Sequence, residues 1–209
     1  MSEKPYHHGD LRTAMIEKGI EMINEGGLPA LSLRKVAAAC NVSHAAPYAH
    51  FSGKDDLLIA IDNHITEHFV KVLEDSAQAS GDSPESLFRM GQAYILFFSR
   101  NPQYFAFFFS RTNAPIKLEP EPSNNYKPFE LYKNLMLTLL DKVDYPKALQ
   151  IDTLVANWAF VHGLAAFSVM FRKPYDDEWE QRIPSMLSSM RIVRPEERSN
   201  FDSAKERLL

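Results

Sequence analysis

Residues 43–46 read SHAA, a run of small and hydrogen-bonding side chains at the expected start of a short helix. Histidine can hydrogen-bond to the edge of a base, and an alanine methyl group can contact the methyl group of thymine. We therefore predict that these four residues meet base edges in the major groove of double-stranded DNA. The predicted base-contacting residues are Ser43, His44, Ala45 and Ala46. Arg34, near the start of the preceding helix, can reach a phosphate or a guanine edge.

Patterns typical of catalysis or metal binding are weak. His64 and His68 are four residues apart, but their segment reads HITEH and not the HExxH of zinc proteases. A solvated helix face explains this pair more simply. The chain has neither a glycine-rich phosphate loop nor a GxSxG nucleophile elbow, and its single cysteine, Cys40, rules out a cysteine pair. We therefore expect no enzyme activity, no cofactor and no metal site.

Two short helices joined by a tight turn are expected to position the SHAA residues. Ser32 is a good N-cap for a helix over 33–40. Asn41 tolerates the left-handed conformation that ends such a helix. Ser43 is then expected to cap a second helix over 44–50. This arrangement is a helix-turn-helix, whose second helix enters the major groove by its N-terminal end.

Pro47 is the unusual residue of the second short helix, since proline has no backbone N–H. If Ser43 is the cap, Pro47 is the fourth helical residue and its missing N–H is the first that would bond within the helix. The proline then removes one terminal bond, to the Ser43 carbonyl, and stiffens the segment that approaches the bases.

Composition limits the class of protein only broadly. The 209 residues are 45% hydrophobic and carry a net charge of −4, so the protein is not basic overall. Residues 1–54 hold six Lys/Arg and five Asp/Glu, a net charge of +1, which leaves −5 for the rest. A single cysteine favours a reducing compartment. The N-terminus lacks the apolar core of a signal peptide, so we expect a cytoplasmic protein with no membrane partner.

Helical spacing of apolar residues continues through the remainder of the chain, without strand alternation or an internal repeat. We predict an all-α fold with a helix-turn-helix domain over 1–53 and a helical effector-binding and dimerisation domain over 54–209. The longer predicted helices are 10–25, 53–78, 84–100, 102–111, 126–143, 147–172 and 176–191.

The segment LSLRKVAAACNVSHAAPYAHFSGKDDLLIAI (31–61) resembles the N-terminal signature of TetR-family transcriptional regulators, and YHHGDLRTAMIEKGIEMINEGG (6–27) is similar to that family's first helix. NWAFVHGL (157–164) resembles the Trp-His-Gly motif of one C-terminal subgroup. The resemblance implies that Tyr48, His50 and Lys54 contact phosphates, which sets register without reading sequence. Where the family often has glycine, this chain has Asn41 and Ala45.

Eight of the seventeen residues 94–110 are aromatic. Core packing accounts for most of them, but adjacent residues of a helix diverge by about 100°, so Phe107–Phe109 cannot all face one core. The resemblance implies a ligand cavity in this part of the chain, and we expect a small apolar or aromatic effector. The first candidates to line the cavity are Tyr94, Phe98, Trp158 and His162. His162 is equally compatible with a hydrogen-bonded core histidine.

The helix over 147–172 is apolar nearly all round, which predicts burial on both sides, by its own core and by a second subunit. Together with the helix over 176–191 it is expected to form a four-helix dimer interface. A twofold dimer requires a near-palindromic operator. We therefore predict a homodimeric, ligand-responsive regulator, most simply a repressor. The alternative is a helical small-molecule-binding or protein-interaction module without specific DNA binding.

Overall fold

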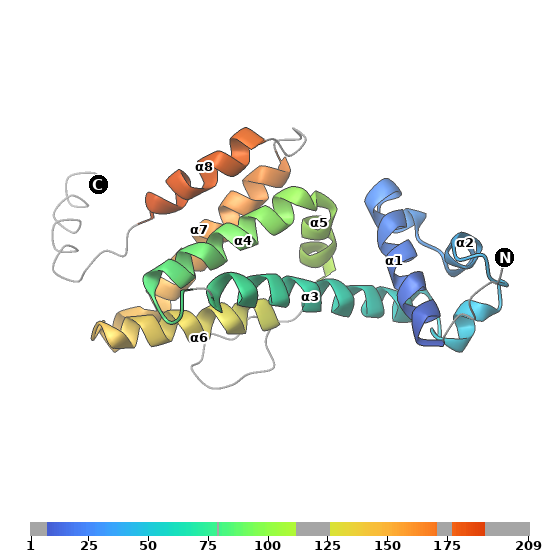
Figure 1. The fold of residues 1–209 in the computed structure, drawn as a ribbon, viewed down its shortest axis with the longest axis horizontal. Helices are drawn as coiled ribbons and strands as arrows, with labels where there is room; N and C mark the ends of the chain where they lie inside the picture. The colour runs from blue at the N-terminus through green and yellow to red at the C-terminus, as the bar shows by residue number, and fades with distance from the viewer. Residues whose placement is uncertain (1–7, 79, 112–125, 171–176, 191–209) are drawn as a thin grey trace, which may run out of the picture. The chain divides into compact units, whose positions relative to one another are not determined.

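The computed structural model describes residues 8–78, 80–111, 126–170 and 177–190 (Figure 1). These residues form helices and turns with no strand among them, so the all-α prediction is confirmed. The elements are α1 (His8–Gly26), η1 (Leu28–Ala30), α2 (Leu33–Ala39), η2 (Ala46–Ala49), α3 (Lys54–Gln78), α4 (Pro84–Arg100), α5 (Pro102–Arg111), α6 (Lys127–Lys142), α7 (Lys147–Met170) and α8 (Asp177–Ser188). Residues 171 and 172 of the predicted helix over 147–172 lie outside the described residues. So do residues 176 and 191 of the predicted helix over 176–191.

The chain divides into two compact units. The first contains residues 1–71 and 103–113, and the second contains 72–102 and 114–209. The N-terminal unit therefore includes most of α3. The functional boundary between residues 53 and 54 stays a prediction.

In the N-terminal unit the predicted N-cap of α2 and the predicted left-handed residue after α2 are both present. Ser32 Oγ accepts a hydrogen bond from the Lys35 backbone N–H at 3.2 Å, which caps α2. Asn41 has φ of 55°, the left-handed conformation predicted for the residue after α2. The buried apolar side chains include Met15, Ile16, Val36, Phe51, Leu57 and Ile61. At Gly19 an added Cβ would lie 2.7 Å from Ile61 Cδ1, so this glycine lets α1 pack closely on α3.

The predicted α-helix over 44–50 is wrong. Residues 46–49 form the 3-10 helix η2, preceded by a turn at 44–45, and the N-cap is Ala45 without a side-chain hydrogen bond. The Ser43 carbonyl accepts from Ala46 N at 3.0 Å, and the Ala45 carbonyl accepts from Tyr48 N at 3.1 Å. In an α-helix the Ser43 carbonyl would need an N–H from Pro47, which proline lacks, so the tighter i to i+3 pattern replaces it.

Residues 103–111 of α5 are grouped with the N-terminal unit. The hydroxyl of Tyr104 is hydrogen-bonded to the side chain of Asn24 on α1. Phe107 and Phe108 are buried, while Phe109 is 38% exposed. The prediction that the three neighbouring phenylalanines cannot share one core is therefore confirmed.

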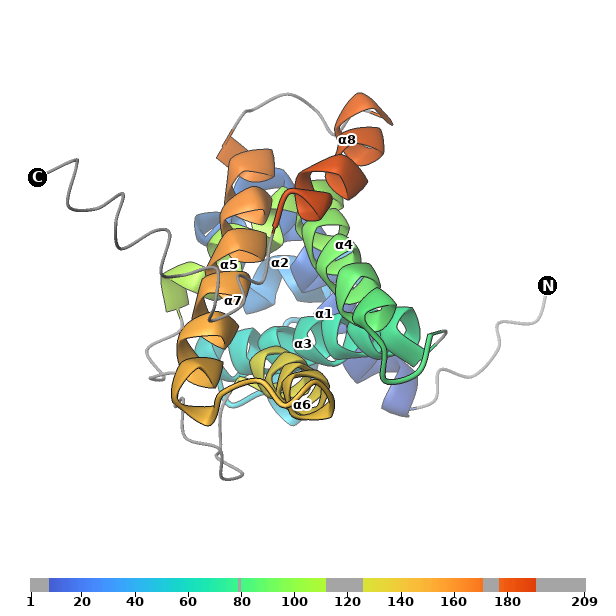
Figure 2. The same cartoon turned by 90° about the vertical axis from the view of Figure 1, so that its left-hand side faces the viewer.

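In the C-terminal unit α4 packs along α7, and both helices contact α6; α8 packs on α4 (Figures 1 and 2). Pro84 begins α4, as predicted. Ser83 is the N-cap residue, but its hydroxyl donates to the Ser80 carbonyl at 2.9 Å and does not cap the helix. The core of this unit includes Tyr94, Ile95 and Phe98 from α4, Phe129 and Met136 from α6, and Leu154 and Ala165 from α7.

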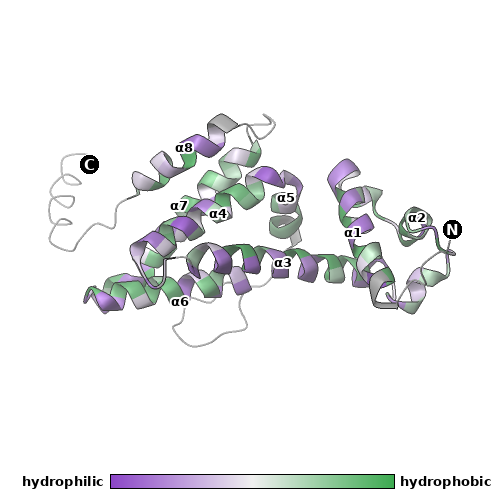
Figure 3. Ribbon diagram, viewed as in Figure 1, coloured by the Kyte–Doolittle hydropathy of each residue, from purple (hydrophilic) through white to green (hydrophobic). Residues whose placement is uncertain are grey.

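Hydrophobic residues predominate along α7 (Figure 3). Among the described residues it is the one helix that is long and apolar enough to cross a membrane by length and composition. Leu154 and Ala165 are fully buried, whereas Val155, Phe167 and Met170 are exposed. One side of α7 thus packs in its own subunit and the other is left uncovered in the single chain.

Part of the apolar stripe of α8 packs within its own unit, and the four-helix dimer interface stays a prediction. Ile183 and Leu187 are buried within the chain, and Met186 is half-buried. The helix uses this face against its own unit, where it contacts α4.

Candidate nucleic-acid interface and ligand cavity

The predicted DNA-contacting residues lie mostly at the surface of the helix-turn-helix. The exposed residues are Arg34, Ser43, His44, Ala45, Tyr48 and Lys54, and the half-exposed ones are Ala46 and His50. Tyr48 is 64% exposed, which is unusual for so large a side chain and leaves both its ring and its hydroxyl available to a partner. Pro47, between Ala46 and Tyr48, is buried, so η2 turns one side inward and the other outward.

The N-terminus of α3 lies next in the chain and is stabilised locally. Asp56 Oδ2 accepts from the Ser52 backbone N–H at 2.9 Å, and Asp55 and Asp56 place negative charge in the first turn. Lys54 Nζ donates to the Leu28 carbonyl of η1 at 3.3 Å. This hydrogen bond holds an exposed ammonium group at a defined place beside the helix-turn-helix.

Phe51 fixes η2 to the rest of the unit. Its side chain is 1% exposed, and its backbone N–H donates to the Pro47 carbonyl at 2.9 Å. The guanidinium of Arg12 on α1 lies 5.3 Å from the centre of the Phe51 ring, a cation–π contact. Phe51 is therefore a core residue of the N-terminal unit.

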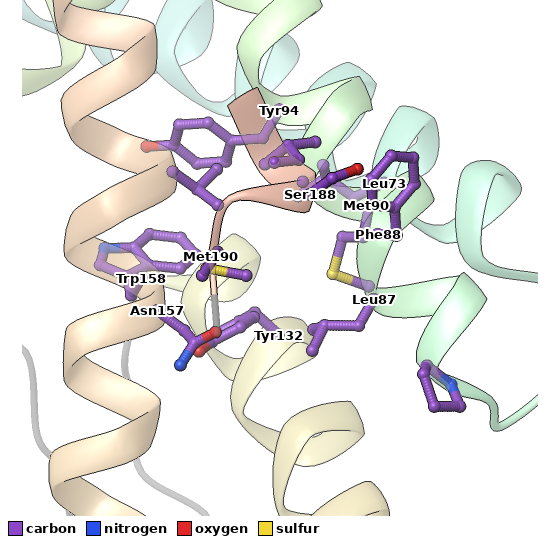
Figure 4. Close-up of a pocket in the computed structure, with 14 residues that line it drawn as sticks. Leu73, Leu87, Phe88, Met90, Tyr94, Tyr132, Asn157, Trp158, Ser188 and Met190 are labelled. Carbon is purple, nitrogen blue, oxygen red and sulfur yellow. The ribbon is translucent and has the colours of Figure 1, made fainter. Parts of the chain in front are cut away.

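The C-terminal unit encloses a cavity of about 240 Å³ between α3, α4, α6, α7 and α8 (Figure 4). Its lining residues are Leu73, Pro84, Leu87, Phe88, Met90, Gly91, Tyr94, Tyr132, Asn157, Trp158, Val161, Leu187, Ser188 and Met190. None of these fourteen residues is charged, so the cavity is suited to an apolar molecule.

Trp158 is held in this cavity wall by three aromatic rings. The centre of its ring lies 5.2 Å from Tyr94, 5.1 Å from Phe129 and 5.2 Å from Tyr132. These separations are typical of edge-to-face and tilted aromatic pairs. The indole of Trp158 is thus held between aromatic side chains of α4 and α6.

Tyr94 is linked to His162 on α7, because Tyr94 Oη and His162 Nδ1 are 2.9 Å apart. Burial raises the pKa of the Tyr94 hydroxyl well above its usual value, so the hydroxyl stays protonated. Burial also lowers the pKa of His162, which favours the neutral imidazole. The pair therefore contributes a hydrogen bond and no charge beside the cavity.

Residues 15–61 match the family of bacterial regulatory proteins called the tetR family. The match covers α1 from residue 15 onward, the helix-turn-helix and the first turns of α3. This segment is similar to the DNA-binding part of tetR-family regulators. The match ends at residue 61, so the subgroup inferred from NWAFVHGL (157–164) stays a prediction.

Curated relatives also share a limited segment with this chain. The HTH-type transcriptional repressor Rv3405c of Mycobacterium tuberculosis is 28% identical over 75 residues. The HTH-type transcriptional regulator Mb3439c of Mycobacterium bovis has the same identity over the same length. The aligned region covers 36% of this chain and 40% of each relative.

Solved structures match this chain over most of its length and establish the fold. A protein of unknown function from Rhodococcus sp. RHA1 is 23% identical with a TM-score of 0.68, covering 90% of this chain and 99% of that one. A TetR family transcription regulator from Marinobacter aquaeolei VT8 is 19% identical with a TM-score of 0.54, covering 85% and 93%. The regulator FadR from Bacillus subtilis, solved with stearoyl-CoA, is 14% identical with a TM-score of 0.63, covering 84% and 95%.

Of the four predicted cavity residues, Tyr94 and Trp158 line the cavity. His162 contacts Tyr94 from α7. Phe98 does not line the cavity: it is fully buried, with its ring centre 5.1 Å from that of Tyr94. Sequence reasoning missed Asn157, which directly precedes Trp158; a polar residue within an apolar helix was the available signal.

Proposed function

We propose that this protein is a sequence-specific DNA-binding transcriptional regulator, a ligand-responsive repressor that binds a near-palindromic operator as a homodimer. The observation that carries the proposal is the exposed Tyr48, on a helix-turn-helix within the segment that matches the TetR family. Nearby exposed basic side chains, Arg34 and Lys54, are suited to contacts with the phosphate backbone. The regulator acts in the cytoplasm.

The roles of the residues follow from their positions. Ser43, His44, Ala45 and Ala46 precede or begin η2 and contact base edges. Tyr48, His50, Lys54 and Arg34 contact phosphates and set the register of the unit on the duplex. The predicted interface is therefore formed by Arg34, Ser43, His44, Ala45, Ala46, Tyr48, His50 and Lys54.

The proposed dimer forms through the uncovered side of α7. Val155, Phe167 and Met170 are exposed on this helix, at 39%, 53% and 74%. At Gly163 an added Cβ would meet no atom within 4 Å, so the single chain leaves open space there for another helix. Burying such side chains against a second copy is favourable at about 25 cal/mol per Å² of apolar surface.

The proposed switch has two states. The effector binds in the cavity of the C-terminal unit, and α3 connects that unit to the helix-turn-helix because its residues belong to both. By linkage, an effector that releases DNA must bind the DNA-free protein more tightly than the operator complex. Equal effector affinity for both forms would contradict this mechanism.

The first experiment is an in vitro selection from random DNA duplexes, followed by affinity measurements at two salt concentrations. We expect enrichment of a palindrome and binding that weakens steeply with salt. A Tyr48→Ala/Lys54→Ala double variant should lose most of this affinity, and loss of the Lys54 phosphate contact alone should reduce the salt slope by about 1. Lys142→Ala, an exposed lysine of α6, is the matched control and should bind normally.

If no duplex is enriched, the proposal fails and the alternative gains: a helical module that binds a small molecule or a protein without specific DNA contacts. A double variant that binds with the affinity and the salt dependence of the parent would remove the assigned roles of Tyr48 and Lys54.

A further inference from the structure

The side-chain oxygen of Asn157 on α7 is a buried hydrogen-bond acceptor that a ligand can use. The residue is 6% exposed and lines the cavity. Its Nδ2 donates to the Thr153 carbonyl at 2.7 Å. This bond determines which way the amide faces, because a carbonyl accepts only from the amide nitrogen. Asn157 Oδ1 is then left buried, with no hydrogen-bond partner among the residues that the structure describes.

Two other polar groups of the cavity wall have their protons engaged. Tyr132 Oη donates to the Leu154 carbonyl at 2.7 Å, and Ser188 Oγ donates to the Pro184 carbonyl at 2.7 Å. Neither proton is therefore free to reach Asn157. Figure 4 shows Asn157 beside Trp158 and Tyr132 at one end of the cavity. An unsatisfied acceptor in such a place costs free energy until a donor reaches it.

The volume and the lining residues of the cavity limit which molecules can donate a hydrogen bond to Asn157 Oδ1. A cavity of about 150 Å³ lined by apolar side chains accommodates benzene. The volume of about 240 Å³ here is suited to two fused rings or an aliphatic group of the same size. Phe88, Tyr94 and Trp158 provide flat aromatic surfaces. Since none of the lining residues is charged, an ionised ligand would lose its hydration without gaining a counter-charge.

We propose that the cavity binds a small uncharged molecule, about the size of two fused rings, that carries a hydroxyl or N–H group and donates one hydrogen bond to Asn157 Oδ1. This assignment names the effector class and rests on the proposed sensing function for its biological meaning. The binding itself is a property of the C-terminal unit and requires no DNA.

The test uses three probes of one shape: 2-naphthol, naphthalene and 2-naphthoate. Calorimetry on the full chain without DNA, at neutral pH, compares the three dissociation constants. We expect 2-naphthol to bind about tenfold more tightly than naphthalene, because only the hydroxyl satisfies Asn157 Oδ1. The anion 2-naphthoate should bind more weakly than either. Equal affinities for 2-naphthol and naphthalene in the parent protein would overturn the proposal without any variant.

Three variants locate the interaction. Asn157→Leu removes the acceptor with little change in volume, and should reduce the preference for 2-naphthol over naphthalene to about onefold. Asn134→Leu makes the same substitution at an exposed residue of α6 that does not line the cavity, and should keep the preference. Leu87→Trp fills the cavity and should abolish binding of both neutral probes.

Each result bears on one proposal. Tight naphthoate binding, no binding of either neutral probe, or a preference that survives Asn157→Leu would overturn the effector class. Failure to enrich an operator duplex would leave these binding constants unchanged and would count against the proposed regulatory function alone.

Discussion

His162 is a half-buried histidine whose charge state depends on its surroundings. Its ring is hydrogen-bonded to Tyr94 at 2.9 Å, and burial lowers its pKa from the ordinary value of 6.5. The unfolded chain therefore binds a proton at this histidine at a higher pH than the folded chain does. Its contribution to stability is complete above about pH 6.5 and decreases as the pH falls below that value.

This difference gives a prediction for thermal unfolding. Between pH 7.5 and pH 5.5 the parent protein should lose more thermal stability than a His162→Gln variant, which has no group to titrate at this position. His68→Gln, a substitution of an exposed histidine on α3, should behave like the parent. Differential scanning fluorimetry at the two pH values measures the effect. Identical pH responses of the parent and His162→Gln would rule out a role for burial of this ring.

At the scale of the element, the turn between α2 and η2 depends on one backbone conformation. Asn41 has φ of 55°, and its N–H donates to the Ala38 carbonyl at 3.1 Å. Val42 N donates to the Ala37 carbonyl at 3.0 Å, which completes the end of α2. The orientation of η2 relative to α2 therefore depends on a left-handed residue at this point.

We expect Asn41→Val to destabilise the protein by about 1–3 kcal/mol, because a β-branched residue is strained in the left-handed region. Asn41→Gly should be close to neutral or slightly stabilising, since glycine adopts this φ without strain. Urea unfolding of the two variants beside the parent gives the comparison. Equal stability of Asn41→Val and Asn41→Gly would show that the turn relaxes to another conformation.

At the scale of the whole molecule, the uncovered side of α7 predicts the oligomeric state. Phe167 is 53% exposed in the single chain, and we propose that it is buried between two copies. A charge placed at a buried subunit interface loses hydration without a partner, which favours separation of the subunits. The mass of one chain is 23.9 kDa, so a dimer is readily distinguished from a monomer.

We expect the parent to elute as a dimer and Phe167→Glu to elute as a monomer in size exclusion with light scattering. Val143→Glu is the matched control: Val143 is 68% exposed, follows α6, and lies outside the proposed interface. It should remain dimeric. A dimeric Phe167→Glu would place the interface elsewhere, and a monomeric parent would remove the dimer from the proposed function.

The sequence by itself determined the helical class and most helix ends, because their signals are local. Ser32 caps α2, Asn41 ends it, and Pro84 begins α4, each through interactions with backbone a few residues away. The match of residues 15–61 to the TetR family likewise follows from sequence. The 3-10 helix at Pro47 is also encoded locally, because proline lacks the N–H that an α-helix would need at this position and the bond from Ala46 N to the Ser43 carbonyl replaces it.

Only the tertiary structure decided which residues share the cavity. Tyr94 lines it and Phe98 does not, although both lie on α4 one turn apart, because the packing of α6 and α7 determines where space remains. Ile183 and Leu187 turn toward their own unit for the same reason. The unsatisfied oxygen of Asn157 depends on contacts from several helices at once. A periodic pattern shows which face of a helix is apolar, whereas the neighbour that covers it is determined by non-local packing.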